Sequence, residues 1–228
     1  MITSAANPRL KLVRRLHSRS QRERTGLFAC EGEDLLAAAL AAGLEPVDLL
    51  VAGESVTPEL LASVSTLPHA SRTIGVFRRA DLPAFSERPV GLALWHVSDP
   101  GNVGTLIRAA DALGPAFVAL SEGCADPTGP KALRASAGAV FRVPLGRFEE
   151  PPGRRIALVT HGGEPLPELE LHEGDVFVLG AEREGLPPEL VEQCAEATTI
   201  PLAEGAESLN VAVAGAIALY EWRRRWSS

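Results

Sequence analysis

The feature that most constrains the fold is a series of short apolar runs without regular polar alternation. Residues 90–97, 116–120 and 176–179 are the clearest of them. A strand that is apolar on both sides is buried on both faces, which is typical of a parallel sheet covered by helices. Further strands are expected at 156–159 and 197–200, with helices over 103–113, 131–137, 188–194 and 209–226. The second part of the chain is therefore predicted to be an α/β domain with a mostly parallel sheet.

A smaller α/β unit is predicted before this domain. It would contain a basic helical stretch, strands at 27–31 and 47–51, and helical windows at 33–42 and 58–64. Residues 81–89 mix proline, charge and serine without clear periodicity, and an apolar run follows. We therefore expect two domains, residues 1–87 and residues 88–228.

Positive charge is concentrated at the N-terminus. Residues 1–24 hold seven arginines and lysines against one glutamate, although the whole chain has a formal net charge of −7. Such a segment can neutralise the phosphates of a nucleic acid, and it can equally be a solvated helix face that contacts nothing. Charge alone does not decide between these two interpretations.

The composition predicts a soluble cytoplasmic protein with a substantial core, since 46% of residues are hydrophobic and 22% charged. Cys30, Cys124 and Cys194 show neither paired nor metal-ligand spacing, so we expect reduced thiols and no metal. The charged N-terminus does not resemble a secretion signal. No apolar window reaches the length of a membrane span, so no membrane association is expected.

Three polar loops, residues 99–104, 180–185 and 208–214, lie between predicted strands and helices. Ligands of open α/β sheets bind outside the carboxyl ends of the strands, and all three loops are expected there. The sequence therefore predicts one site built from three separate segments.

The first loop places Asn102 where it can cap the following helix, and Arg108 falls off the buried stripe of that helix. Gly104, one turn before Arg108, would leave room for its side chain or for a ligand. A planar, permanently charged donor near a helix start suits a phosphate or a developing oxyanion. The alternative is an ordinary cap and a solvated arginine.

The second and third loops combine glycines with isolated polar side chains. Gly180 and Gly185 would let backbone groups approach a small ligand closely, and Glu182 lies between them. Glu182 could instead only complement a helix N-terminus, and Ser208 could be only an N-cap. Asn210 opens a helix with a small-residue face, which suits close packing against another helix, including one from a second subunit: Ala212, Gly215, Ala216 and Leu219.

Together these segments resemble the SpoU (TrmH) family of S-adenosylmethionine-dependent RNA ribose methyltransferases, within the SPOUT superfamily. The similarity covers roughly residues 90–222 and four motifs, at 99–114, 130–139, 180–186 and 200–214. Residues 1–85 more loosely resemble the substrate-binding domain of ribosomal-RNA members, itself similar to a ribosomal-protein fold. The cues there are Thr3-Ser4 with Asn7-Pro8, and Phe28 to Gly32.

This resemblance implies a SPOUT-type α/β catalytic domain with a deep trefoil knot, and a homodimer that assembles the active site across its interface. It implies S-adenosylmethionine as cofactor and RNA as substrate, ribosomal RNA more than transfer RNA. A transfer-RNA methyltransferase and a catalytically silent RNA-binding or ribosome-assembly factor remain alternatives. A dinucleotide-dependent enzyme lacks support, because neither a G-x-G-x-x-G motif nor a phosphate-binding loop is present.

The resemblance also assigns roles to individual residues. The expected catalytic residues are Arg108, Asn102, Glu182, Ser208 and Asn210. The expected cofactor-binding residues are Gly180, Glu182, Ile200, Leu202, Ser208 and Leu209. The expected RNA-binding residues are Arg9, Lys11, Arg14, Arg15, Arg108, Arg134 and Ser136.

Arg108 has been viewed in the family as a general base, but a guanidinium is a poor proton acceptor at neutral pH. We expect it to bind a phosphate and to stabilise the emerging 2′-oxyanion of the ribose, oriented by Asn102, Ser208 and Asn210.

Overall fold

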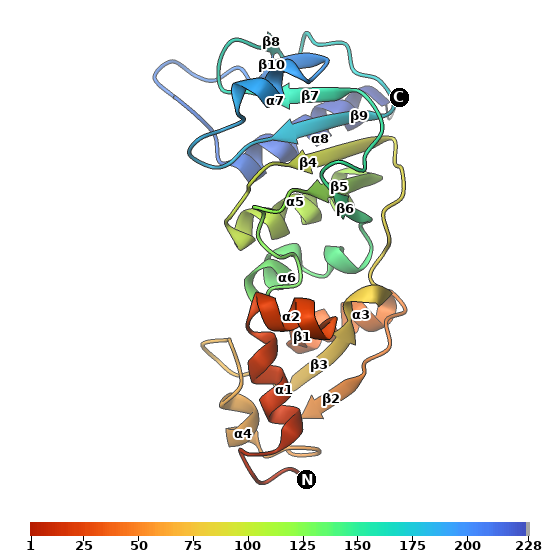
Figure 1. Cartoon of the computed structure of the whole chain (residues 1–228), viewed down its shortest axis with the longest axis vertical. Coiled ribbons are helices and arrows are strands. Elements are labelled where there is room, and N and C mark those ends of the chain that lie inside the picture. The colour runs from red at the N-terminus through yellow and green to blue at the C-terminus, as the bar shows by residue number, and fades with distance from the viewer. Residues whose placement is uncertain (227–228) are drawn as a thin grey trace.

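The computed structural model describes residues 1–226, which form two sheets arranged one after the other along the long axis of the molecule (Figure 1). A three-stranded sheet belongs to the N-terminal part and a seven-stranded sheet to the C-terminal part. Residues 82–89 connect the short 3₁₀ helix Arg79–Asp81 to the first strand of the larger sheet.

The N-terminal sheet is antiparallel, in the order β1-β3-β2. Its elements are α1 (Pro8–Leu16), α2 (Arg19–Thr25), β1 (Leu27–Glu31), α3 (Glu33–Ala41), β2 (Asp48–Val51), α4 (Pro58–Ala62) and β3 (Thr73–Arg78). Asn7 caps α1 through its side chain, and Gly26 ends α2 in the left-handed conformation. The predicted basic helical stretch is thus two helices, and β3, the central strand, was not predicted.

The C-terminal sheet is entirely parallel, in the order β6-β5-β4-β9-β7-β10-β8. Its strands are β4 (Val90–Leu94), β5 (Ala116–Leu120), β6 (Leu145–Arg147), β7 (Arg155–Leu158), β8 (Glu164–Pro165), β9 (Asp175–Leu179) and β10 (Glu196–Thr199). The fully buried β4 and β9 confirm that uninterrupted apolar runs predict strands covered on both faces. The short strands β6 and β8, which were not predicted, form the two sheet edges.

Helices cover both faces of the larger sheet. They are α5 (Pro100–Leu113), α6 (Pro130–Ser136), α7 (Pro188–Glu192) and α8 (Val211–Trp226). On one face, Leu92, Leu94 and Leu179 join α5 and α8 in the main core. On the other, Ala93 and Val178 pack with Leu190 of α7.

Two glycines show how closely the helices approach one another. A Cβ on Gly104 would lie 2.4 Å from the backbone oxygen of Ala132, so this glycine allows α5 to contact α6. The prediction that Gly104 makes room for Arg108 or a ligand is therefore wrong. A Cβ on Gly215 would lie 2.4 Å from Cδ2 of Leu106, so the small-residue face of α8 packs on α5 of its own chain.

The two parts of the chain share one apolar core. Phe28 of β1 and Phe141, which follows α6, stack with ring centroids 6.3 Å apart. Residues of α3 belong to the same buried cluster as the large sheet. Within residues 1–226, no helix combines the length and apolar character needed to cross a membrane.

Candidate functional site

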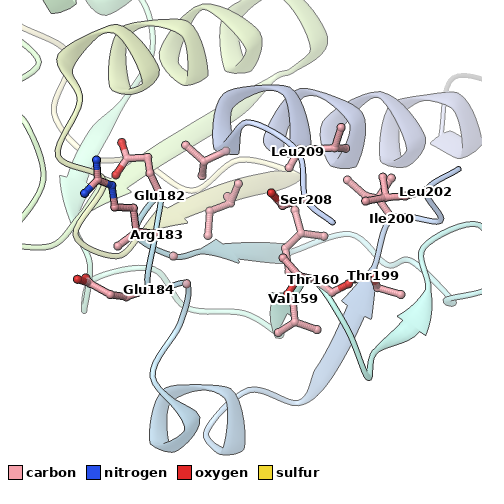
Figure 2. Close-up of a pocket in the computed structure, with 17 residues that line it drawn as sticks. Val159, Thr160, Glu182, Arg183, Glu184, Thr199, Ile200, Leu202, Ser208 and Leu209 are labelled. Carbon is pink, nitrogen blue, oxygen red and sulfur yellow. Dashed lines mark hydrogen bonds between the residues drawn. The ribbon is translucent and has the colours of Figure 1, made fainter. Parts of the chain in front are cut away.

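A pocket of about 250 Å³ lies at the carboxyl ends of β7, β9 and β10, beside the start of α8 (Figure 2). All six residues predicted to bind a cofactor line it: Gly180, Glu182, Ile200, Leu202, Ser208 and Leu209. The loop after β7, with Val159 and Thr160, forms a further wall. This wall was not predicted, because the β7 segment carries no motif beyond its apolar run.

Gly180 and Gly185 shape the loop that closes one side of the pocket. Ala181 and Gly185 exchange two backbone hydrogen bonds, of 3.1 and 3.0 Å. A Cβ on Gly180 would lie 2.1 Å from the carbonyl carbon of Gly185, and Gly185 itself has a φ of 68°. Only glycine avoids the collision at position 180, and the left-handed backbone favours glycine at position 185, so the loop turns tightly and brings its backbone to the pocket.

Glu182 connects this loop to the start of α5. Its carboxylate accepts hydrogen bonds from the backbone N–H groups of Ser98 and Asp99, at 3.3 and 3.1 Å, and from Nδ2 of Asn102 at 3.1 Å. Partial burial alone would raise the pKa of Glu182, but these donors lower it below its usual value. The side chain is therefore an ionised acceptor that holds two loops together.

Asn102 does not cap α5, contrary to the sequence-based expectation. Asp99 is the N-cap, because its Oδ1 accepts from the backbone N–H of Asn102 at 3.0 Å. Lys131 donates to the other oxygen of Asp99 at 2.6 Å and lowers the pKa of that carboxyl. The amide of Asn102 is thereby free to contact Glu182 and Asn210.

Asn210 completes the chain of contacts. Its Nδ2 donates to Oδ1 of Asn102 at 3.0 Å, and its Oδ1 accepts from the N–H groups of Ala212 and Val213 at 2.9 and 3.3 Å. Asn210 is thus the N-cap of α8, and the alternative that Ser208 caps this helix is wrong. Ser208 lines the pocket, and its hydroxyl makes no hydrogen bond within residues 1–226.

Three loops far apart in sequence therefore meet through Glu182, Asn102 and Asn210 at the rim of a glycine-lined pocket. Residues 89–220 match the model of the SpoU rRNA methylase family, and residues 7–81 match the MRM3-like substrate-binding domain. The chain belongs to the SpoU rRNA methylase family.

Relatives of this SpoU protein align over nearly its whole length. It is 33% identical to a protein of Synechocystis sp. named an uncharacterized tRNA/rRNA methyltransferase, over 100% of this chain and 95% of the relative. It is 31% identical to the 23S rRNA (guanosine(2553)-2′-O)-methyltransferase RlmP of Bacillus subtilis, over 97% of this chain and 98% of the relative. The AdoMet-bound rRNA methyltransferase structure from Sinorhizobium meliloti covers 100% of this chain and 98% of its own, with a TM-score of 0.88 and 28% identity.

Arg108 of this SpoU chain is exposed on α5, and within residues 1–226 its guanidinium makes no hydrogen bond or ion pair. It lies six residues after Asn102, which corresponds to a rise of about 9 Å along the helix axis. Arg108 does not form part of the pocket wall. Its catalytic role stays a prediction.

The positively charged side chains predicted to bind RNA differ in whether they already contact other residues of the protein. Lys11 and Arg15 are exposed, whereas Arg9 is paired with Asp48. Arg14 donates to Ser63 at 3.1 Å, and Arg134 to Thr66 at the same distance.

The prediction that Ser136 contacts RNA is wrong. Its side chain is fully buried, and its hydroxyl donates to the backbone oxygen of Leu133. Arg22, which belongs to the basic segment, is also buried.

The described residues contain no cluster of His, Cys, Asp or Glu that could hold a metal ion. Cys30, Cys124 and Cys194 are free thiols, and burial raises the pKa of Cys30 to about 12.

Proposed function

We propose that this chain transfers a methyl group from S-adenosylmethionine to a ribose 2′-hydroxyl of RNA, and that the RNA is ribosomal. The observation that carries the proposal is the Glu182–Asn102–Asn210 chain of hydrogen bonds, which fixes three motif loops around one pocket. Family membership and the match of residues 7–81 to a substrate-binding domain support it.

The residues that line the pocket fit the chemistry of S-adenosylmethionine. Leu158, Ile200, Leu202 and Leu209 give it apolar walls, and the tight turn that begins at Gly180 brings backbone groups to its edge. Gly180, Ile200, Leu202, Ser208 and Leu209 would hold the cofactor. When bound, S-adenosylmethionine supplies an electrophilic methyl carbon on a sulfonium.

The protein's task is then to align a ribose hydroxyl with the methyl carbon and to ease the loss of its proton, which would pass to solvent water. Arg108 binds a neighbouring phosphate and stabilises the negative charge that develops on the 2′-oxygen, while its guanidinium stays protonated. Asn102, Ser208 and Asn210 orient the ribose. Glu182 is a poor base, because three N–H donors occupy its carboxylate, and it keeps the loops in register.

The test compares Arg108→Ala and Arg108→Lys with the native enzyme, using ribosomal RNA as substrate. Cofactor affinity, measured by calorimetry, should stay unchanged, while methyl transfer by the alanine variant falls about 10²–10³-fold. Lysine should restore only part of the rate, because it lacks the planar donor fork. Arg147→Ala, an exposed arginine on the sheet edge, is the matched control. Full activity of Arg108→Ala would refute the proposed role.

The alternatives to a ribosomal-RNA enzyme predict different results. A transfer-RNA enzyme would leave ribosomal RNA unmodified, and a silent assembly factor would bind no cofactor. Mapping ribose methylation in total RNA from a deletion strain distinguishes a ribosomal-RNA enzyme from a transfer-RNA enzyme. Calorimetry with S-adenosylmethionine distinguishes an enzyme from a silent assembly factor. We infer that the enzyme works in the cytoplasm, where ribosomal RNA is processed in bacteria.

We infer further that the enzyme is a homodimer. The outer face of α8 exposes Val213 and Tyr220, seven residues apart, and the preceding loop exposes Leu209. Exposed apolar residues in one stripe are typical of a protein interface. The stripe starts at the pocket, so a second subunit seated there would lie beside the active site.

The domain division at residues 87 and 88 and the trefoil knot are also inferences. The change from the antiparallel to the parallel sheet between Arg78 and Val90 supports the division. The pocket supports the knot, because the segment from Thr199 to Ala214 lies against the loops after β7 and β9.

A further inference from the structure

A buried ion pair joins the two parts of the chain. Nε of Arg22, in α2, donates to Oδ2 of Asp126 at 2.8 Å, and the two side chains are 5% and 4% exposed. Nη1 of Arg22 also donates to the backbone oxygens of Leu16 and His17, where α1 ends. Arg22 therefore fixes the corner between α1 and α2 to the loop between β5 and α6, which contains Asp126.

That loop is hydrogen-bonded to residues 96 and 97, which lead into the active site. Oγ of Ser121 accepts from the N–H of His96 at 2.9 Å, and the N–H of Ala125 donates to the oxygen of Val97 at 2.9 Å. The next two residues along the chain, 98 and 99, donate their N–H groups to Glu182. A short series of hydrogen bonds thus connects the ion pair to the catalytic loops.

Stability alone does not account for this ion pair. Removing two charges from water is costly, and well-packed apolar residues in their place are often as stabilising or more so. The stacked rings of Phe28 and Phe141 and the shared apolar core already hold the two parts together. A charged pair adds a specific direction, because the guanidinium bonds Asp126 and the end of α1 in one geometry.

We propose that Arg22 and Asp126 are positioning residues, which hold α1 and α2 in the one orientation that presents bound RNA to the active-site loops. The inference rests on the proposed function, since it assumes that α1 carries part of the RNA-binding surface. Neither side chain contacts substrate or cofactor. Both act through the segments that they join.

The test uses two changes of the ion pair and one control. Asp126→Asn removes the charge but keeps an oxygen that can accept from the N–H and hydroxyl of Thr128, as Asp126 does. Arg22→Met combined with Asp126→Leu replaces the pair by apolar side chains, and it also removes the acceptor that Arg79 and Thr128 share. Glu23→Gln breaks the exposed Arg19–Glu23 ion pair within α2. It leaves in place the hydrogen bond from Arg19 to the backbone oxygen of Cys124, so this second contact between α2 and the loop is kept.

Asp126→Asn should lower kcat/KM for RNA about tenfold. Its Kd for S-adenosylmethionine should stay within about twofold of the native value. For Glu23→Gln, both kcat/KM for RNA and Kd for S-adenosylmethionine should stay within about twofold of the native values. The apolar double variant should keep the RNA defect, and its Tm should lie below the native value because Arg79 and Thr128 lose their acceptor. If this variant or Asp126→Asn has native RNA kinetics, the pair does not position the RNA and the inference is wrong.

Hydrogen exchange separates this inference from the proposed function. A native enzyme that binds the cofactor but methylates no ribosomal RNA would refute the proposed function alone. In that case Asp126→Asn should still speed amide exchange in residues 96–102 relative to Glu23→Gln. Equal exchange in the two variants would overturn the positioning role.

Discussion

The side-chain amide of Asn210 donates to Oδ1 of Asn102 at 3.0 Å, although 108 residues separate them in sequence. One amide starts α8 and the other lies in the first turn of α5. The contact fixes the two helix starts against each other on the side where Glu182 holds the third loop. Substitutions that separate the capping role of Asn210 from this contact can therefore show which of the two matters for the reaction.

Asn210→Asp should keep the cap of α8, since aspartate is as good an N-cap as asparagine, but it removes the donor to Asn102. We expect near-native stability and methyl transfer reduced about 10²-fold through misplacement of the loops. Asn210→Ala should lose the activity and also about 1 kcal/mol of unfolding free energy. Urea unfolding measures the stability of each variant, and initial rates measure its methyl transfer. Native activity of the aspartate variant would show that the Asn102 contact is dispensable.

Gly180→Ala should damage cofactor binding while the fold persists. The added Cβ meets the backbone of Gly185, and displacing that backbone costs about 1–3 kcal/mol. We expect calorimetry to show a correspondingly weaker Kd for S-adenosylmethionine. Gly185→Asn is the control, because this position has open space and a left-handed backbone that asparagine tolerates. Equal affinities of the two variants would contradict the collision argument.

The basic helix can be tested without deleting it, which is necessary because α1 buries Leu10, Val13 and Leu16. Lys11→Gln combined with Arg15→Gln should weaken RNA binding. The slope of log K against log salt should fall by about 0.7–0.9 for each phosphate that the variant no longer neutralises. Arg147→Gln, on the edge of the other sheet, should leave the slope unchanged. An unchanged slope in the double variant would remove α1 from the RNA surface.

The exposed face of α8 predicts the oligomeric state. Val213→Glu combined with Tyr220→Glu places two charges on this face and should give a monomer in sedimentation velocity, with reduced methyl transfer. Leu40→Glu, an equally exposed apolar position on α3, should leave the sedimentation coefficient unchanged. A native protein that sediments as a monomer would refute the homodimer.

Acid stability should depend on Asp126. Burial alone would raise its pKa, but the hydrogen bond from Thr128 and the positive charges of Arg79 and Arg22 lower it below its usual 3.8. A lowered folded-state pKa gives stability that is present above 3.8 and is lost as pH falls through the folded value. As the pH falls below 3.8, the free energy of unfolding measured in urea should therefore decrease more steeply for the native protein than for Asp126→Asn. Parallel losses would contradict this assignment.

The apolar runs predicted most of the catalytic sheet, because burial on both faces leaves a clear pattern. β5 agrees residue for residue with the predicted 116–120, and β1 with 27–31. β6 and β8 are short edge strands, where too few residues carry a pattern. β3 was missed although it is central, since a single six-residue run gives no sign of which strands it joins.

The site was predictable in its location but not in its contacts. The expectation that polar loops meet at the carboxyl ends of parallel strands located the pocket. The cap of α5 was predicted wrongly, and the alternative of a Ser208 cap at α8 was also wrong. Asp99 and Asn102 are equally good candidates, as are Ser208 and Asn210, until the first helical residue is known. The burial of Arg22 had no local signal, since its partner lies 104 residues away.

The pocket walls come from the loops after β7, β9 and β10 and from the beginning of α8, so the pocket is complete only once the chain has been synthesised as far as Ala214. A chain that stops before Asn210 lacks this last wall and has no complete cofactor site. Since the cofactor can bind only the finished arrangement, its cellular concentration adds stability to completed molecules alone. The methyl donor thereby distinguishes finished enzyme from truncated product.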